Sequence, residues 1–281
     1  MWAIIGGSGF ESFDEFEVVS HENRHTPFGE ASAGLARIKI AGEAGLFLPR
    51  HGSHHELLPS EINYRANIFA LKNLGATRVL SISAIGSLKK EFKPGDLVIP
   101  NQYIDRTKGF RQHTFCGKGV VGHVSLAKPV SPELLEWASK ARSQFSWDTH
   151  VKATYICVEG PYFSTQSESH VSIQQGASII GMTNFPEYAL AREAGLAYLP
   201  ACFVTDYDCW DDEIPHVTLA GVLEIMRQNK LKAFELAKTV FRQAKDLLPN
   251  GIPDQGLRHA VFTSPEKISA TDRQWLSVLQ K

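Results

Sequence analysis

A short apolar run that ends in two aspartates places the strongest constraint on how this chain can fold. Residues 201–204 read Ala-Cys-Phe-Val, and Thr205-Asp206-Tyr207-Asp208 follow directly. The run predicts a buried strand, and carboxylates at the end of such a strand are costly unless they are paired, protonated or in use. In open α/β sheets, ligands bind at the carboxyl ends of the strands. Asp206 is therefore a candidate acid at a binding site, with a solvated Asp-rich turn as the simpler alternative.

Predicted strands and helices alternate along most of the chain, which indicates an α/β fold. The first strand covers residues 2–5 and a later one begins at Arg78. Ser131 and Pro132 open a helix, because serine is a favoured cap and proline is tolerated in the first turn. Residues 101–124 lack such a pattern, and we expect a long functional loop there.

Composition fits a globular domain and excludes several classes of protein. With 281 residues, 43% of them apolar, the chain can bury one large core. We assign residues 1–249 to that domain and residues 250–281 to a C-terminal extension of unpredicted structure. A net charge of -1 argues against nucleic acid as a partner. No apolar stretch is long enough to cross a membrane, and the N-terminus lacks a secretory signal pattern. The four cysteines show no CxxC spacing, so we expect reduced thiols and a cytoplasmic protein.

Three segments at the ends of predicted strands could together bind an anion. The turn Gly6–Gly9 exposes backbone N–H groups, although it lacks the further glycine of a dinucleotide fingerprint and the lysine of a P-loop. Arg50 can grip a phosphate through two parallel hydrogen bonds, and His51 can add a donor. The small-residue turn 84–87 could meet the same anion. Taken singly, these segments are explained equally well as a glycine turn needed for its backbone angles and a surface histidine cluster.

The histidine cluster also raises the possibility of a metal. His51, His54 and His55 are closely spaced, but only Glu56 nearby could complete a ligand set, and Pro59 discourages a long ligand-bearing helix. We therefore expect no metal site.

Taken together, the segments resemble the trimeric purine nucleoside phosphorylases, and among them the enzymes that act on 5′-methylthioadenosine. The similarity covers about residues 2–245 in the family's order, and the combination is far more specific than any one motif. The matching segments are AIIGGSGF (3–10), TPFGEAS (26–32), LPRHGSHH (48–55), NYRANIFALKNLG (63–75), SAIGSL (83–88), PGDLVIPNQYIDRT (94–107), EGPYFST (159–165), GMTNFPEYALAREAG (181–195) and TDYDCW (205–210).

The resemblance implies a single-domain fold with a central mixed sheet flanked by helices, a homotrimer, and phosphorolysis of a purine nucleoside. The implied enzyme is a pentosyltransferase of purine and methionine salvage that cleaves 5′-methylthioadenosine with inorganic phosphate as co-substrate and no cofactor. By position in the matched segments, phosphate binding falls to Ser8, Arg50, His51, Ser83, Ala84 and Thr183, catalysis at the base to Asp206 and Asp208, and nucleoside binding to Phe163, Met182, Val217, Leu219, Val222 and His123. Of these, His123 resembles a residue lent by the neighbouring subunit, while Val217, Leu219 and Val222 would form an apolar 5′ pocket.

Two departures and two alternatives accompany the resemblance. Ser8 and Ser83 stand where threonine is common in close relatives, and Tyr162 replaces an arginine. One alternative is a phosphorylase of 6-oxopurine nucleosides such as inosine, guanosine or methylthioinosine, in which asparagine replaces Asp206. The other is a non-catalytic nucleoside-binding protein, which we would expect to have lost phosphate ligands such as Arg50.

Overall fold

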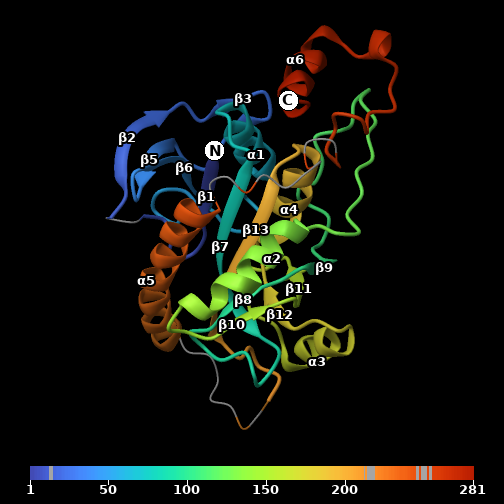
Figure 1. Ribbon diagram of the computed structural model, residues 1–281. Helices are drawn as coiled ribbons and strands as arrows, with labels where there is room; N and C mark the ends of the chain where they lie inside the picture. Colours follow the sequence, from blue (N-terminus) through green and yellow to red (C-terminus); the bar gives the residue numbers. More distant parts are fainter. Residues whose placement is uncertain (13–14, 212, 214–218, 245–246, 248–251, 253–254) are drawn as a thin grey trace.

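The computed structural model describes residues 1–12, 15–211, 213, 219–244, 247, 252 and 255–281, and a large mixed sheet forms its centre (Figure 1). The strands are β1 (Trp2–Gly6), β2 (Glu17–Glu22), β3 (His25–Thr26), β4 (Gly29–Glu30), β5 (Leu35–Ile40), β6 (Glu43–Pro49), β7 (Arg78–Ser87), β8 (Leu97–Ile99), β9 (Gln102–Arg106), β10 (Thr149–Val151), β11 (Thr154–Val158), β12 (Ile179–Gly181) and β13 (Ala197–Asp206). The helices are α1 (Tyr64–Asn73), α2 (Pro132–Ala141), α3 (Gln166–Gln174), α4 (Asn184–Glu193), α5 (Leu219–Gln243) and α6 (Ala270–Leu279).

Parallel strands form the middle of the sheet and antiparallel strands complete it. The main order is β10-β8-β13-β7-β1-β6-β5-β2, in which β13, β7, β1 and β6 run parallel. β5 and β2 continue the sheet antiparallel on one side, and β8 pairs antiparallel with β13 on the other. A branch leaves β7 through β12 and β11 to β9. The expected mixed sheet is confirmed.

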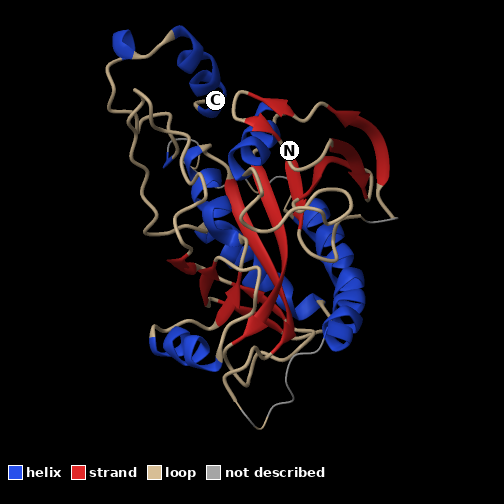
Figure 2. Ribbon diagram, turned by 180° about the vertical axis from the view of Figure 1, so that it is seen from behind, coloured by secondary structure: helices blue, strands red, loops and turns tan. Residues whose placement is uncertain are grey.

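Helices cover both faces of the sheet because the central strands are apolar on both faces. In β1, Ala3 and Ile5 pack in one core cluster with α1, α4 and α6, whereas Trp2 and Ile4 pack in another with α2 and α5. This division follows from the two-residue period of a strand. Figure 2 shows the long central strands enclosed between the two groups of helices.

The predicted helix start at Ser131 is confirmed, but the expected irregular loop is only partly so. Ser131 Oγ accepts from Leu134 N, and Pro132 opens α2. Within residues 101–124, however, β9 pairs with β11. The sequence pattern does not reveal β9, since its five residues Gln-Tyr-Ile-Asp-Arg are mostly polar and none is fully buried.

The C-terminal part of the chain ends in a helix that packs on the core. In α6, Trp275, Leu276 and Leu279 are buried in the cluster that also contains α1. The Trp275 ring lies 5.4 Å from the ring of Phe28. The proposed boundary between residues 249 and 250 stays a prediction, because residues 248–251 lie outside the described part of the chain.

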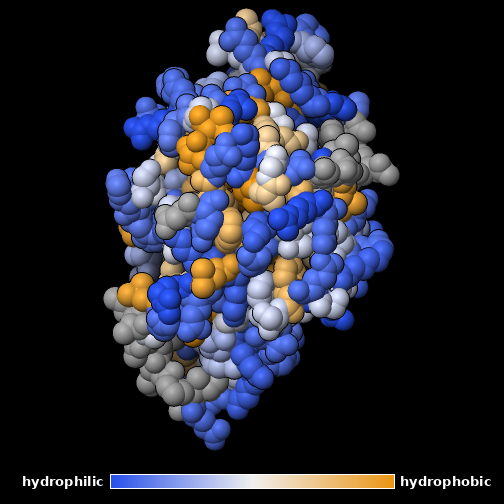
Figure 3. All heavy atoms as spheres, turned by 60° about the vertical axis from the view of Figure 1, so that its left-hand side comes forward, coloured by the Kyte–Doolittle hydropathy of each residue, from blue (hydrophilic) through white to orange (hydrophobic). Residues whose placement is uncertain are grey.

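Across the described residues, none of the helices combines the length and the apolar character needed to cross a bilayer. On the face seen in Figure 3, hydrophilic side chains predominate and apolar ones occur in small groups.

Strand register brings the predicted anion segments to one level of the sheet. Gly6 at the end of β1 is paired with Pro49 at the end of β6, and with Ile82 in β7. Ser83 is in turn paired with Cys202 of β13. The Gly6–Gly9 turn and Arg50 therefore meet at the carboxyl ends of β1 and β6, beside Ser83 in the middle of β7. Ligands bind at this edge of such sheets. The predicted turn at residues 84–87 is wrong, because β7 continues to Ser87 and pairs with β13 as far as Gly86.

Candidate active site

A cavity of about 730 Å³ opens at the carboxyl ends of the central strands. It brings together ten of the residues proposed from the sequence, which are Ser8, Arg50, His51, Ser83, Ala84, Phe163, Met182, Thr183, Asp206 and Asp208. The residues proposed for anion binding and the two aspartates thus share one chamber, although they come from segments far apart in the chain.

Arg50 is fully buried, and other protein groups occupy most of its donors. Its Nε and Nη2 donate to Glu187 at 2.7 and 2.9 Å. A second Nη2 hydrogen goes to Ser81 Oγ at 2.7 Å, and Nη1 donates to Ile82 O at 3.1 Å. Four of the five N–H groups are therefore used within the described structure, and one on Nη1 remains. The two-pronged grip that we expected on phosphate is made on Glu187 instead.

The glycine turn makes room for this arginine. A Cβ on Gly7 would lie 2.4 Å from Arg50 Nη1 and 2.7 Å from Ile82 O, so any side chain there would displace the guanidinium. Ser8, the next residue, has no hydrogen-bond partner for its N–H or hydroxyl among the described residues. Both groups are available to a ligand in the cavity.

His51 is held in one tautomer. Its Nδ1 lies 2.9 Å from Leu57 O, and because a carbonyl can only accept, Nδ1 carries the proton. Burial, together with the adjacent Arg50 charge, lowers the pKa of His51 to about 4. The ring is therefore neutral at pH 7, with Nε2 as an acceptor, and becomes a second donor only on protonation.

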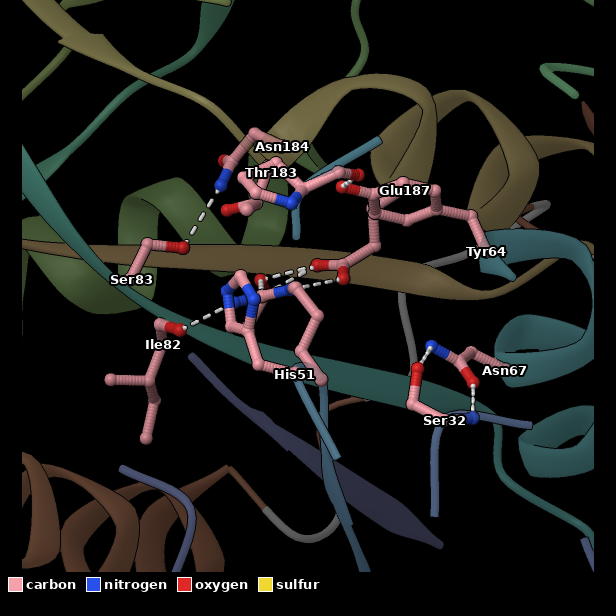
Figure 4. Close-up of polar contacts among 12 residues, drawn as sticks. Ser32, His51, Tyr64, Asn67, Ile82, Ser83, Thr183, Asn184 and Glu187 are labelled. Carbon is pink, nitrogen blue, oxygen red and sulfur yellow. Dashed lines mark hydrogen bonds and ion pairs between the residues drawn. The ribbon is translucent and has the colours of Figure 1, made fainter. Parts of the chain in front are cut away.

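Asn184 sets the direction of the Ser83 hydroxyl. Its Nδ2 donates to Ser83 Oγ at 3.1 Å, while its Oδ1 accepts from Tyr103 OH at 3.2 Å. Figure 4 shows Asn184 reaching across to Ser83, with Thr183 beside it. Because Ser83 Oγ already accepts from Asn184, its own hydrogen is free to be donated to an anion.

Asp206 lies just after an irregularity in β13, where it faces the cavity. The register between β13 and β7 shifts between Val204 and Asp206, which is the geometry of a bulge. Asp206 Oδ1 accepts from Asp208 N at 2.8 Å, and Oδ2 lies 2.7 Å from Thr205 Oγ1. Burial raises the pKa of Asp206, although these two hydrogen bonds oppose the shift.

Thr205 can serve Asp206 in either protonation state. Its single hydroxyl hydrogen has two acceptors within reach, Asp206 Oδ2 at 2.7 Å and Ile85 O at 3.1 Å. When Asp206 is ionised, Thr205 donates to it. When Asp206 is protonated, the carboxyl can donate to Thr205, whose hydrogen then goes to Ile85. Asp206 can thus lose and regain a proton without leaving Thr205 unpaired.

Asp208 is constrained by its backbone and by a buried serine. Its φ of 55° lies in the left-handed region, where aspartate and asparagine are better tolerated than most residues. Ser169 of α3, which is fully buried, donates to Asp208 Oδ2. Burial raises the pKa of Asp208, and the nearby Asp206 charge adds to the rise. The two aspartates therefore disfavour each other's ionisation.

Several structurally important residues escaped the sequence reasoning. Arg111 is buried and joins Glu159, which follows β11, to the residues at the start of α4, since it donates to the Glu159 carboxylate and to the carbonyls of Met182 and Phe185. The only signal for this pairing was Glu159 at a predicted strand end. Glu187, which holds Arg50, had no signal beyond a charged residue inside an apolar helix.

The structure describes only part of the segment that was expected to form the apolar 5′ pocket. Val217 lies outside the described residues, and of Leu219 and Val222 only the backbone in α5 is described. Farther along α5, Leu223 and Met226 line the cavity. A Cβ on Gly9 would lie 2.7 Å from Met226 Cε, so the start of α5 packs directly over the glycine turn. The proposed roles of Val217, Leu219 and Val222 therefore stay predictions, and the sequence reasoning did not select Leu223 and Met226.

Two further proposed residues lie at or beyond the margin of the cavity. Phe163 lines it but is 66% exposed. His123 lines a different hollow, together with Arg192 and His259, and its ring lies 5.3 Å from that of Phe262. Tyr162, the residue in place of an arginine, is largely exposed and accepts from Lys108 Nζ at 2.7 Å.

Comparison with known proteins agrees with this architecture. The sequence model of the phosphorylase superfamily matches residues 2–242. The S-methyl-5′-thioadenosine phosphorylase of Geobacter sulfurreducens is 41% identical over 276 residues, which cover 98% of this chain and 96% of that protein. The protein of the same name from Thermofilum pendens is 46% identical over 252 residues, with 90% and 92% covered.

Solved structures give the same result. A methylthioadenosine phosphorylase from an antarctic soil metagenomic library superposes with a TM-score of 0.90 at 42% identity, covering 99% of this chain and 98% of that one. The methylthioadenosine phosphorylase from Schistosoma mansoni, in complex with adenine, gives a TM-score of 0.86 at 34% identity, with 92% and 98% covered. The resemblance that the motifs indicated is confirmed, and the chain belongs to the phosphorylase superfamily.

Proposed function

We propose that this chain catalyses the phosphorolysis of 5′-methylthioadenosine to adenine and 5-methylthioribose 1-phosphate, a pentosyl transfer in purine and methionine salvage. The observation that carries the proposal is the arrangement of one cavity, which has hydrogen-bond donors for an anion at one side and the carboxyl groups of Asp206 and Asp208 at another. The names of the relatives point to the same reaction.

Phosphate would bind at the strand ends and attack the anomeric carbon. Ser8, the remaining Arg50 N–H and the Ser83 hydroxyl supply donors, with Ala84 and Thr183 completing the wall. The monohydrogen phosphate dianion also carries one O–H, which the acceptor at His51 Nε2 suits. A dianion held close to the sugar stabilises the positive charge that develops there as the glycosidic bond weakens.

At the base, Asp206 would act as the general acid. As a phosphate oxygen forms its bond to the anomeric carbon, the C–N bond breaks and its electron pair passes to the purine. Protonated Asp206 donates to nitrogen 7 of the purine, and Thr205 then donates to the carboxylate that forms. Asp208 and Phe163 would hold the base, while the backbone at Met182 would hold the ribose.

The remaining features of the proposal concern cofactors, assembly and compartment. Neither a metal nor an organic cofactor takes part, since an acid and a bound dianion supply the two stabilisations that the reaction needs. The active species is a homotrimer in which His123 completes a neighbour's site. His123 lines a hollow other than this chain's own cavity, which supports that role. The four free cysteines support a cytoplasmic location.

A substrate panel tests the proposal directly. Purified protein is incubated with methylthioadenosine, adenosine, methylthioinosine or inosine, with and without inorganic phosphate, and the free base is separated and quantified. We expect adenine release that requires phosphate and is fastest from methylthioadenosine. Preferential cleavage of the inosine compounds would instead indicate a 6-oxopurine phosphorylase. Binding of nucleoside without release of base would indicate a non-catalytic protein.

A further inference from the structure

Glu187 is the most heavily bonded carboxylate near the anion side of the cavity, yet it does not line the cavity. It is 1% exposed and accepts from Arg50 Nε, Arg50 Nη2, Ser81 Oγ at 2.5 Å and Tyr198 OH at 2.8 Å. Figure 4 shows its carboxylate directed from α4 toward the region of His51 and Ile82. Its described partners come from the sheet or its edge, so this carboxylate on α4 links Arg50, which follows β6, to Ser81 of β7 and Tyr198 of β13.

The pairing settles both the charge and the direction of Arg50. Burial by itself would lower the pKa of Arg50, but the adjacent Glu187 carboxylate outweighs it and the net shift is upward, so the guanidinium stays charged. Arg50 and Glu187 form a buried ion pair, which has no net charge. Nε and Nη2 of the guanidinium donate to Glu187, and one Nη1 hydrogen is donated to Ile82 O.

We infer that Glu187 is a positioning residue for phosphate, which holds Arg50 so that a single Nη1 hydrogen is directed at the anion. The inference rests on the proposed function and deepens it. Phosphate is recognised here by the placement of donors in a site whose arginine is already neutralised, rather than by an excess of positive charge.

Two substitutions of Glu187 distinguish two explanations of phosphate binding, the position of the Arg50 guanidinium and the net charge of the site. Glu187→Gln removes the negative charge, so a site governed by charge would bind the phosphate dianion more tightly. Placement predicts the opposite, because an amide nitrogen would face the donors of Arg50 and release the guanidinium. Glu187→Asp keeps the charge but withdraws the carboxylate by about 1.5 Å, one carbon–carbon bond. If charge controls phosphate binding, the affinity of this variant for phosphate should be unchanged. If the position of Arg50 controls it, the affinity should fall.

Glu193→Gln is the matched control. Glu193 is also a buried carboxylate on α4, but it accepts from Thr114 Oγ1 and Phe115 N and does not touch Arg50. It therefore reports what the loss of any buried carboxylate from this helix does to the protein.

The experiment measures the binding of inorganic phosphate by calorimetry in the four proteins, together with the Michaelis constants for phosphate and nucleoside. We expect Glu187→Gln and Glu187→Asp each to weaken phosphate binding about 10- to 100-fold, the scale of one charge-assisted hydrogen bond. The nucleoside Michaelis constant should stay close to the wild-type value, and Glu193→Gln should bind phosphate normally.

Three results would overturn the inference. They are tighter or unchanged binding in Glu187→Gln, normal binding in Glu187→Asp, and equal weakening in Glu193→Gln. If Glu187→Gln fails to fold, Glu187→Asp decides the question by itself. Because calorimetry needs no turnover, a wild-type protein that binds phosphate but cleaves no nucleoside would refute the proposed function and leave the test of Glu187 intact. A wild-type protein that binds no phosphate would refute both.

Discussion

Replacing Asp206 by asparagine should abolish acid catalysis while leaving the fold intact. The substitution is nearly isosteric, and the surrounding hydrogen bonds can accept it. The side-chain oxygen of the asparagine would still accept from Asp208 N, and its amide nitrogen would donate to Thr205 Oγ1, whose hydrogen would then go to Ile85 O. Burial already favours the neutral form of Asp206. We therefore expect little change in the melting temperature.

The Asp206→Asn variant should cleave methylthioadenosine far more slowly than the wild-type protein. An amide cannot deliver a proton to nitrogen 7 of the purine, and loss of a general acid lowers rates by about 100- to 10,000-fold. This corresponds to about 3 to 5 kcal/mol in the barrier. A 6-oxopurine presents a carbonyl where adenine has an amino group, and the asparagine amide can donate to that carbonyl. Turnover of methylthioinosine should therefore fall much less than turnover of methylthioadenosine.

The assay compares kcat/KM for the two nucleosides at saturating phosphate in the wild-type and Asp206→Asn proteins. The ratio of the two values should shift toward methylthioinosine by about 100-fold or more. Thermal unfolding of both proteins controls for loss of structure. If the ratio is the same in both, Asp206 does not read the base, and the acidic turn is better explained as a structural feature.

The remaining predictions concern the anion, the pH profile, the assembly and the 5′ group. Arg50→Ala should raise the phosphate Michaelis constant by a factor worth about 2 to 5 kcal/mol, and a normal constant would remove Arg50 from the site. Burial raises the pKa of Asp206 and the protonated form is the active one, so kcat/KM should fall as pH rises through that pKa. Thr205→Val removes a hydrogen bond to the carboxylate and should therefore shift this fall to higher pH. If the fall occurs at the same pH in the variant, another group causes it. Sedimentation at assay concentration should show a trimer, and a fully active monomer would contradict the role of His123 in a neighbour's site. If the start of α5 forms an apolar pocket, kcat/KM for methylthioadenosine should exceed that for adenosine by a factor that corresponds to about 1 to 3 kcal/mol. Equal values would mean that the apolar residues at the start of α5 only pack in the core.

The sequence by itself was sufficient for the fold class and for ten of the residues that line the cavity. Short apolar runs end at Gly6–Gly9, Arg50 and Asp206, close to the ends of β1, β6 and β13, and in a parallel sheet such ends lie on one edge. Ser83 was also expected at a strand end, but β7 continues to Ser87. Motifs that are far apart in the sequence, each at the end of a strand, can therefore be predicted to lie close together in the fold. The order of the motifs then identified the family, since their combination is much more specific than any one of them.

Only the tertiary structure decided which partner each polar group takes. Arg50 was expected to direct its fork at phosphate, but the fork meets Glu187, 137 positions away in the chain. Asn184 directs Ser83 across 101 positions. The bulge before Asp206 depends on the register of β13 against β7. Hydrogen bonds act over about 3 Å, so their partners are determined by how distant segments pack, and no local pattern in the sequence encodes that distance.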